Sequence, residues 1–380
     1  MIPRTVYESE HEQLRSSIRK FLEQEAVPHH NQWEKDGQID RQLWNKAGAM
    51  GFLCPTLPEQ YGGIGADFRF NAVIGEECVR AGISGWGVSV HSDIVAPYIL
   101  HNGSDYLKDK YLPAAVTGEC VLAIAMTEPG TGSDLQAVKT TAELDGDHYV
   151  INGTKTFITN GQQADAVVVV CKTDPTAGAA GTSLIIVDAG TPGFERGSNL
   201  EKIGLKAQDT SELFFQDVRV PKRNLIGEPG KGFVYLMQEL PQERLSIALG
   251  SIATAEAILQ ETVGYVKDRT AFGKPLAVFQ NTQFKLAELD AEITSARVFV
   301  DRCLELLLVG ELDAISAAKS KLLATELNCR VVDECLQLHG GYGYMWEYPV
   351  AKAYADSRIS RIYGGTSEIM KLIIGRDLLS

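Results

Sequence analysis

The chain has 380 residues, of which 44% are hydrophobic and 22% charged, a composition typical of a globular protein with two or three domains. Its formal net charge of -13 argues against nucleic acid as a partner, because phosphate backbones bind basic surfaces. No apolar run reaches the length of about 18 residues that a membrane-spanning helix needs, so no membrane span is predicted.

The residues reveal neither a targeting signal nor a metal site. Residues 1–4 contain no apolar stretch of the kind that a signal peptide has, and acidic residues begin at Glu8. We therefore expect a cytoplasmic protein, with a processed organellar form as the alternative. The seven cysteines are odd in number and no two have CxxC spacing, which predicts neither a disulfide framework nor a zinc site.

Residues 1–118 have the pattern of a helical domain. Apolar residues recur at helical spacing through residues 10–25. Asp40 is a plausible N-cap for a further helix, which should end near Gly51. Residues 58–63, with a proline and two glycines, predict a loop.

Residues 119–228 change to short apolar runs separated by Gly, Pro, Asp and Asn. A hairpin turn is predicted at Asp145-Gly146. Strands are predicted over residues 120–127, 139–144, 148–151, 166–171, 184–187 and 213–220. Short strands of this kind predict a middle antiparallel β-barrel or sandwich.

Residues 229–380 return to helices after the breaker-rich segment 228–232. Residues 283–308 and 314–338 are long amphipathic segments, as expected for a C-terminal four-helix bundle. The predicted fold class is therefore α+β, with an N-terminal helical domain, a middle β domain and a C-terminal helical bundle domain.

Five sequence blocks carry the chemistry. They are residues 123–134 (AIAMTEPGTGSD), 152–161 (NGTKTFITNG), 269–274 (RTAFGK) with Gln280, 337–343 (QLHGGYG) and 361–369 (RIYGGTSEI). The first block has the small residues that let backbone N–H groups approach an anion, but it is not a Rossmann fingerprint, because no GxGxxG opens a helix. In this order and at this spacing, the five blocks resemble the acyl-CoA dehydrogenase family over nearly the whole chain.

The resemblance implies an FAD site. Thr127 and Thr159 would lie at the isoalloxazine ring, where a donor near N5 would stabilise the negative charge that arrives with hydride. Phe157 would pack against the ring, and Ser133 would lie between the FAD pyrophosphate and acyl-CoA. The implied cofactor residues in this group are Ile124, Met126, Thr127, Gly132, Ser133, Phe157, Thr159, Thr366 and Glu368.

A second group implied by the resemblance would reach the FAD of a neighbouring subunit. A lone arginine near a helix end is more often a solvated charge, but the RTAFGK context favours a cofactor role for Arg269. The group implies a homo-oligomer, a tetramer in most relatives. Its members are Arg269, Phe272, Gln280, Gln337, Gly340 and Gly341.

The tail block departs from the family pattern at Gly364. Many members of the family carry the catalytic glutamate at this position, directly after the tyrosine. Glycine removes the carboxylate but keeps the backbone N–H, which in the family donates to the thioester oxygen. A dehydrogenase of this kind then needs a base elsewhere, and the alternative is a binding protein that has lost its base.

Glu243, in the segment 235–245 (YLMQELPQERL), is the predicted base. The segment resembles the long-chain and isovaleryl branches, in which the base precedes an arginine on an earlier helix and the tail position is Gly or Ala. On a helix, Glu243 shares its side with Leu236 and Ile247 and has no basic neighbour at i±3 or i±4, which should raise its pKa. A solvated helix-edge glutamate is the alternative, and Glu239 and Glu368 are fallback bases.

The predicted function is FAD-dependent α,β-dehydrogenation of acyl-CoA thioesters, with long-chain substrates as the closest match and an electron-transferring flavoprotein as the electron acceptor. A short branched-chain, isovaleryl-type dehydrogenase is an alternative because it shares the base position. An acyl-CoA oxidase is another, although the compact length argues against it. The implied substrate-binding residues are Ser133, Gln242, Arg244, Tyr363, Gly364 and Gly365.

Overall fold

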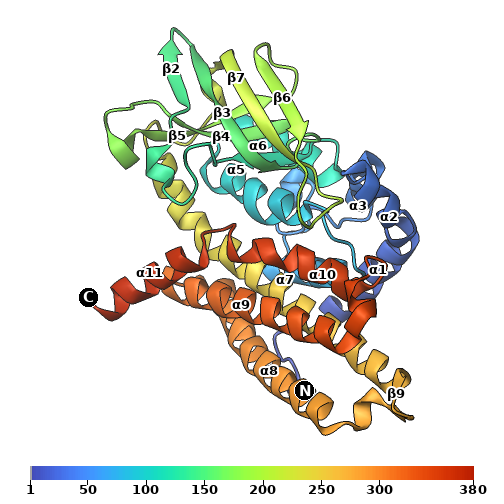
Figure 1. The fold of residues 1–380 in the computed structure, drawn as a ribbon. Helices are drawn as coiled ribbons and strands as arrows, with labels where there is room; N and C mark the ends of the chain where they lie inside the picture. Colours follow the sequence, from blue (N-terminus) through green and yellow to red (C-terminus); the bar gives the residue numbers. More distant parts are fainter. Residues whose placement is uncertain (1) are drawn as a thin grey trace.

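The computed structural model describes residues 2–380, and helices, strands and helices follow one another along the chain (Figure 1). Asp40 accepts a hydrogen bond from the backbone N of Gln42 at 2.8 Å, so the predicted N-cap is confirmed. The N-terminal helices are α1 (Ser9–Glu25), α2 (Val27–Asp36), α3 (Arg41–Ala49), α4 (Phe68–Arg80), α5 (Ala96–Asn102) and α6 (Asp105–Thr117), with a 3-10 turn at Glu59–Tyr61 and a π-helical turn, η2 (Val90–Val95), before α5.

The middle part forms one eight-stranded sheet in the order β6-β7-β3-β2-β4-β5-β8, with β1 beside β4. Its strands are β1 (Leu122–Ala125), β2 (Thr141–Asp145), β3 (His148–Thr159), β4 (Ala166–Lys172), β5 (Thr182–Asp188), β6 (Phe194–Asn199), β7 (Thr210–Pro221) and β8 (Leu225–Ile226). The sheet is not a closed barrel, because β6 and β8 lie at its two ends. Apolar side chains fill both of its faces, and β4 is buried along its whole length.

Two details of the sheet differ from the sequence prediction. The predicted antiparallel pairing does not hold everywhere, because β2 pairs in parallel with β4 at Thr141↔Lys172. It also fails at β1, which pairs in parallel with β4 from Leu122↔Ala166 onward. The chain passes through β2 and β3 between these two strands, and such a long connection permits parallel pairing. The hairpin turn lies at Gly146-Asp147, one residue later than predicted, because Asp145 pairs with His148 and Gly146 adopts φ +64°.

The C-terminal part is a helical bundle, as predicted. Its helices are α7 (Gly232–Asp268), α8 (Gln280–Leu308), α9 (Ala314–His339), α10 (Pro349–Ser357) and α11 (Ser367–Leu378), and a small hairpin of β9 (Thr270–Ala271) and β10 (Lys274–Pro275) joins α7 to α8. Leu249, Ile252 and Val300 belong to the apolar core that α7, α8 and α9 share with α4.

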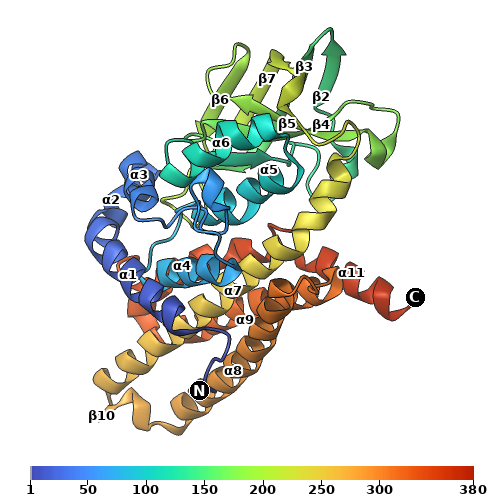
Figure 2. The same ribbon diagram turned by 180° about the vertical axis from the view of Figure 1, so that it is seen from behind.

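Helix α7 links the two halves of the molecule. It begins near the sheet and continues into the bundle, where it lies beside α8 and α9 (Figure 2). Along the way it contacts β5, α5, η2 and α4 in turn. A side chain on its first half therefore lies at the junction of the N-terminal helices, the sheet and the bundle.

Three findings limit the kinds of site that the described residues can form. No helix within residues 2–380 is long and apolar enough to cross a bilayer. All seven cysteines are free. The same residues bring together no group of three His, Cys, Asp or Glu side chains that could hold a metal ion.

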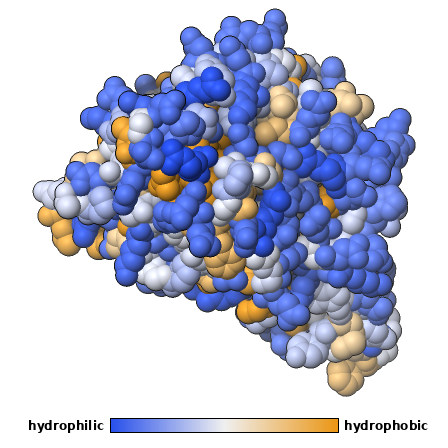
Figure 3. Space-filling view, turned by 90° about the horizontal axis from the view of Figure 1, so that it is seen from above, coloured by the Kyte–Doolittle hydropathy of each residue, from blue (hydrophilic) through white to orange (hydrophobic). Residues whose placement is uncertain are grey.

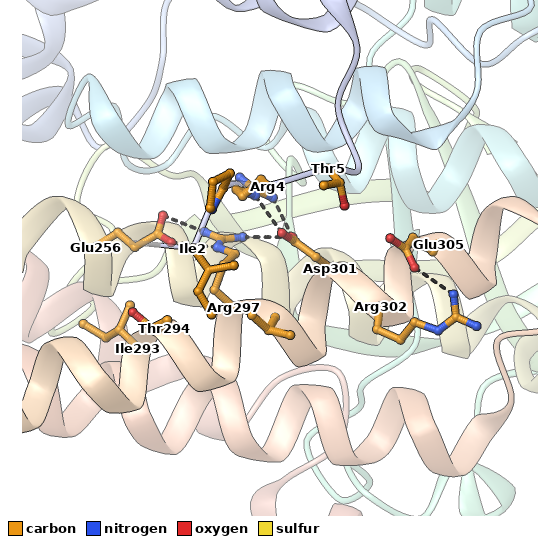
Figure 4. Close-up of a pocket in the computed structure, with 12 residues that line it drawn as sticks. Ile2, Arg4, Thr5, Glu256, Ile293, Thr294, Arg297, Asp301, Arg302 and Glu305 are labelled. Carbon is orange, nitrogen blue, oxygen red and sulfur yellow. Dashed lines mark hydrogen bonds and ion pairs between the residues drawn. The ribbon is translucent and has the colours of Figure 1, made fainter.

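The N-terminal segment is fastened to α4 and α8 by a buried ionic cluster around Glu76, and Figure 4 shows three other members of the cluster, Arg4, Arg297 and Asp301. Arg4 Nη1 lies 2.9 Å from Glu76 Oε1, and Arg15 and Arg297 approach the same carboxylate at 3.1 and 3.2 Å. Asp301 pairs with Arg4 at 2.7 Å. A cavity of about 390 Å³ lies beside this cluster. Its charged side chains already pair with one another and anchor the N-terminal segment, so the cavity is not a candidate active site.

Replacing Glu76 should expose how much the fold depends on this cluster. Burial alone would raise the pKa of Glu76, but the charges of Arg4, Arg297 and Arg15 outweigh it and hold the pKa below its ordinary value. The carboxylate therefore stabilises the folded chain above its unfolded pKa, and this contribution is lost as the pH falls through the folded pKa. We expect Glu76→Gln to lower the free energy of urea unfolding at pH 7 by about 3–5 kcal/mol.

The matched control is Glu12→Gln, since Glu12 also pairs with Arg15 but is exposed. Its effect should stay within about 1 kcal/mol, as for other surface pairs. The deficit of Glu76→Gln should also shrink in acid, where the wild-type carboxylate is protonated as well. Equal losses in the two variants, or a deficit that does not change with pH, would contradict this account.

Candidate active site

Glu243 is a buried carboxylate in the first half of α7, only 5% exposed. Tyr98 on α5 donates a hydrogen bond from its hydroxyl to Glu243 Oε1 at 2.8 Å. Leu236 and Leu240, on the same side of the helix, are buried as well. The alternative of a solvated glutamate at the helix edge does not agree with this burial.

The surroundings of Glu243 tune it for proton transfer near neutral pH. Burial raises its pKa to about 7, although the hydrogen bond from Tyr98 acts in the opposite direction. The charge of Glu239 raises the pKa further, and Arg244 lowers it. A carboxylate with a pKa near the working pH is suited to act as a general base.

The two fallback bases have other surroundings. Glu239 lies one helical turn before Glu243. Its Oε1 is 2.7 Å from His101 Nδ1, so the carboxylate of Glu239 is already paired with the His101 ring. Glu368 is exposed on the first turn of α11. Its own backbone N–H and the Thr366 side chain lower its pKa, so it has neither the burial nor the raised pKa of Glu243.

Gly364 faces the turn of α7 that follows Glu243. It adopts φ +62°, and a Cβ built on it would overlap Cδ1 of Ile247. Ile247 lies four residues after Glu243, on the same side of the helix. The structure thus brings the glycine of the tail block within about one helical turn of the carboxylate on α7.

Lysine and arginine side chains surround this junction. Lys321 on α9 is fully buried and donates to the carbonyl oxygen of Gly365 at 2.8 Å. Arg244 is 6% exposed, and its Nε finds no hydrogen-bond partner within residues 2–380. A buried guanidinium with a free donor suits a wall of a site that receives a polar ligand.

Of the remaining predicted substrate residues, Gln242 and Tyr363 lie near the same junction, whereas Ser133 lies in the loop after β1. Gln242 is half-buried, and its side-chain amide donates to the Asp93 carbonyl on η2 at 2.7 Å. Tyr363 is exposed and directly precedes Gly364. Ser133 is exposed in the glycine-rich loop that follows β1, on the sheet side of the molecule.

A buried ion pair holds the base of that glycine-rich loop. Lys155 on β3 lies 2.9 Å from Glu128 Oε1 and donates to the Met126 carbonyl at the same distance. Glu128 also accepts the backbone N–H groups of Lys139 and Thr140. Both charged groups are buried, so they fix the end of β1 against β3 instead of contacting a ligand.

The predicted flavin residues beside the Lys155–Glu128 ion pair form an edge of the sheet that carries both apolar side chains and hydroxyl groups. Phe157 is 66% exposed and adopts φ +60°, next to a register shift between β3 and β7. Ile124 and Met126 are half-buried at the same end of the sheet. The Thr159 hydroxyl accepts from Gln208 at 3.1 Å, which leaves its own hydrogen free to donate.

This edge fits an isoalloxazine ring, which is apolar across its face and accepts hydrogen bonds at its rim. Phe157 combines a strained left-handed backbone with an exposed aromatic ring, and both features are typical of a residue that contacts a ligand. Thr127 is anchored next to it, because its carbonyl accepts from the backbone N of Thr156 at 2.9 Å. A Cβ added at Gly132 would meet nothing within 4 Å, so the loop keeps open space there.

The second predicted cofactor group lies at the opposite end of the molecule, around the β9–β10 hairpin (Figure 1). Phe272 is 95% exposed with φ +53°. The Arg269 guanidinium lies 5.2 Å from the centre of the Tyr342 ring, which brings the hairpin beside the end of α9. Within one chain this group does not meet the first; its other members, Gln280, Gln337, Gly340 and Gly341, are also exposed.

Sequence reasoning missed three residues of the site. Tyr98 and His101 lie three residues apart on α5, and that spacing was the available signal for a shared helix side. Lys155 had no such signal, because a lysine in a polar strand motif is usually exposed. Thr366 is placed as the N-cap of α11, where its hydroxyl accepts from Ile369 N at 3.2 Å.

Comparison with known proteins finds one family across the whole chain. Family models described as the acyl-CoA dehydrogenase N-terminal, middle and C-terminal domains match residues 8–119, 123–218 and 230–379. The chain is 51% identical to the mitochondrial long-chain specific acyl-CoA dehydrogenase of Mus musculus, with 99% of this chain and 88% of that protein covered. It is 37% identical to the mitochondrial isovaleryl-CoA dehydrogenase of Oryza sativa, with 98% and 92% covered.

A solved structure is similar over its full length. The crystal structure of an acyl-CoA dehydrogenase from Geobacillus kaustophilus superimposes with a TM-score of 0.97 at 52% identity, with 99% of this chain and 100% of that chain covered. The arrangement of the three parts around α7 is therefore shared with that enzyme.

The contact between Gly364 and Ile247 can be tested by a double-mutant cycle. Gly364→Ala should lower the free energy of unfolding by about 1–3 kcal/mol, because a Cβ is disfavoured at φ +62° and overlaps Ile247. In an Ile247→Ala background the same substitution should cost only the backbone part, about 1 kcal/mol. Urea unfolding of the four proteins measures the coupling, and strictly additive effects would show that the two residues do not compete for this space.

Proposed function

The chain belongs to the acyl-CoA dehydrogenase family, an FAD-dependent group of CH–CH oxidoreductases, and we propose that it dehydrogenates long-chain acyl-CoA thioesters with Glu243 as the base. The observation that carries the proposal is the meeting of two distant segments. A buried carboxylate on α7 lies one turn from the glycine that occupies the family's usual base position.

In this proposal Glu243 removes the proton from the α carbon. The α proton of a thioester is weakly acidic, so the carboxylate must be close to the carbon and ready to accept a proton. Its burial and its pKa of about 7 support that role. The backbone N–H of Gly364 would donate to the thioester oxygen, where negative charge develops as the proton leaves.

Bound FAD supplies the hydride acceptor of the reaction. The edge formed by Phe157, Thr127 and Thr159 would hold the ring, with the free Thr159 hydrogen as the donor at its rim. Ile124, Met126, Gly132 and Ser133 would line the same side. Thr366 and Glu368 stay proposed contacts to the ribose and phosphates, and the ionised state of Glu368 argues for contact with the ribose.

A homo-oligomer is part of the proposal. The second cofactor group is exposed and includes Phe272, an exposed aromatic side chain on a backbone with φ +53°, as expected for residues that another subunit covers. Seen from above, the surface is mainly hydrophilic with several separate hydrophobic patches (Figure 3). We propose that Arg269, Phe272 and Gln280 complete the FAD site of a neighbouring subunit, in a tetramer as in most relatives.

Long, straight acyl chains are the proposed substrate class, and an electron-transferring flavoprotein is the proposed electron acceptor. The higher identity to the long-chain relative than to the isovaleryl relative supports the first point. The position of the base does not separate the two, because both branches draw it from the earlier helix. A short branched substrate and an oxidase reaction are therefore the alternatives that the experiment must distinguish.

Anaerobic titration of the FAD-loaded protein with acyl-CoAs of graded length and branching tests this function. Long straight chains should bleach the flavin absorbance fastest. Glu243→Gln keeps the size of the side chain but cannot accept the proton, so bleaching should slow by about 100- to 10,000-fold. Glu239→Gln is the matched control on the same helix and should keep most of the rate.

Each alternative gives its own result in this experiment. Fastest bleaching by isovaleryl-CoA would assign the branched-chain function, and peroxide formation in air during turnover would assign an oxidase. A spectral shift without bleaching, by any acyl-CoA, would identify a binding protein. Bleaching that persists in Glu243→Gln would remove Glu243 from the role of base.

The neighbouring-subunit site can be tested at Phe272. Phe272→Ala should leave the free energy of unfolding of the isolated chain nearly unchanged, within about 0.5 kcal/mol, because the side chain is exposed. It should nevertheless raise the rate of FAD release about tenfold, the effect of losing roughly 1.4 kcal/mol of contact. FAD fluorescence after dilution measures the release.

Val309→Ala is the matched control, since Val309 is an exposed apolar residue at the other end of α8. It should release FAD at the wild-type rate. Unchanged FAD retention in Phe272→Ala would count against a cofactor role for the hairpin.

A further inference from the structure

Helices α5 and α7 face each other through two hydrogen-bonded pairs. Tyr98 donates to Glu243 at 2.8 Å, and His101 Nδ1 lies 2.7 Å from Glu239. The two α5 residues are three apart and the two α7 residues are four apart, so each pair lies one turn from the other. The pairs run in opposite chain directions, as expected for helices that cross antiparallel.

The preceding turn fixes α5 in this register. Residues 90–95 form a π-helical turn, η2, directly before α5. Asp93 in this turn accepts the Ser246 hydroxyl at 2.8 Å, and its carbonyl accepts the Gln242 amide at 2.7 Å. Both donors flank Glu243 on α7, so the contacts that hold η2 also set the direction in which Tyr98 points. Single π-helical turns often occur at functional sites.

We propose that Tyr98 is the positioning residue of the base: its phenol fixes Oε1 of Glu243 and leaves Oε2 to receive the substrate proton. The inference rests on the proposed function of Glu243. Tyr98 is fully buried and so is its partner, which leaves little freedom to either side chain. No other hydrogen bond reaches the Glu243 carboxylate within residues 2–380.

A carboxylate held by one oxygen is better prepared for proton transfer than a free one. The fixed oxygen selects one rotamer of Glu243, and the free oxygen keeps its lone pairs for the substrate. The phenol stabilises the charged form, since a hydrogen bond to a carboxylate favours ionisation. Tyr98 stays a donor at working pH, because burial and the charge of Glu243 raise its own pKa.

Apart from Tyr98, no ionisable side chain within residues 2–380 donates a hydrogen bond to the Glu243 carboxylate. Glu239 pairs with His101, whose pKa is raised by that contact. Burial, and after it the charge of Arg244, lower the pKa of Lys321 on α9. The ionisable groups that face this stretch of α7 are Tyr98 and His101 on α5, Asp93 on η2 and Lys321 on α9, and α7 itself adds Glu239 and Arg244. On α4, Glu76 and Glu77 form ion pairs with Arg15.

The test is the pH dependence of kcat/KM for acyl-CoA oxidation by the FAD-loaded protein. Wild-type activity should rise with pH through the pKa of Glu243, about 7, because the ionised form is the base. Tyr98→Phe removes only the donor, so the pKa of Glu243 should rise and the acidic limb should move up by about one pH unit. At high pH, kcat should fall about tenfold with little change in KM, since the carboxylate loses its fixed orientation.

Tyr111→Phe is the matched control. Tyr111 also donates to a carboxylate, Asp188, at 2.7 Å, in the same apolar cluster of the N-terminal part. Its loss should leave the acidic limb at the wild-type pH. A ring-fluorinated tyrosine in place of Tyr98 should move the limb the other way, to lower pH, because a more acidic phenol is a stronger donor. The fluorinated residue keeps the shape of the tyrosine side chain, so this second test remains usable if Tyr98→Phe folds poorly.

The results separate the two proposals. A limb that stays in place in both Tyr98 variants overturns the positioning role, even if their rates fall. If Glu243→Gln is inactive under the same conditions, the proposed function stands and only the role of Tyr98 fails. If Glu243→Gln keeps the wild-type rate, Glu243 is not the base and the inference about Tyr98 fails with it.

Discussion

The desolvation of the Glu243 carboxylate is the constraint on which the rest of the site depends. Taking an ionisable group out of water is unfavourable unless donors compensate it. Here the hydrogen bond from the Tyr98 phenol compensates only part of this cost, so burial still raises the pKa of Glu243 to about 7. The burial is possible only because α7 runs through the junction where α5, η2, α9 and the tail block meet. The long helix therefore sets the chemistry of the site as well as the packing of the fold.

Much of this arrangement could be predicted from the sequence, and the reasons are local. The change from helical to alternating patterns revealed the order of helices, sheet and helices, and the apolar neighbours of Glu243 indicated its burial. The swap between Glu243 and Gly364 was visible because each lies in a recognisable block. Tyr98 was missed although its spacing to His101 on α5 was readable, because no sequence pattern shows that α5 lies against α7 at Glu243. The parallel pairing of β1 with β4 likewise depends on tertiary packing.

Two buried ion pairs do different work in this molecule. The Glu76 cluster joins the N-terminus, α1, α4 and α8, far along the chain from the site residues. The Lys155–Glu128 pair instead fixes the loop that would receive the cofactor, so that Thr127 and Phe157 are held side by side before anything binds. Such preorganisation lowers the entropy lost on binding. Both the Lys155 and the Glu128 side chains are buried, so they hold the loop in place without contacting a ligand.

The close approach of Ile247 to Gly364 also has an evolutionary consequence. Placing a glutamate at position 364 by a single substitution would meet the isoleucine and would put a second negative charge beside Glu243. If Glu243 is the base, as proposed, losing it first would leave none. Each single step between the two base positions is therefore unfavourable, and a lineage could cross only through paired changes. The geometry of Gly364 would thus keep the proposed base on α7 in descendants of this chain.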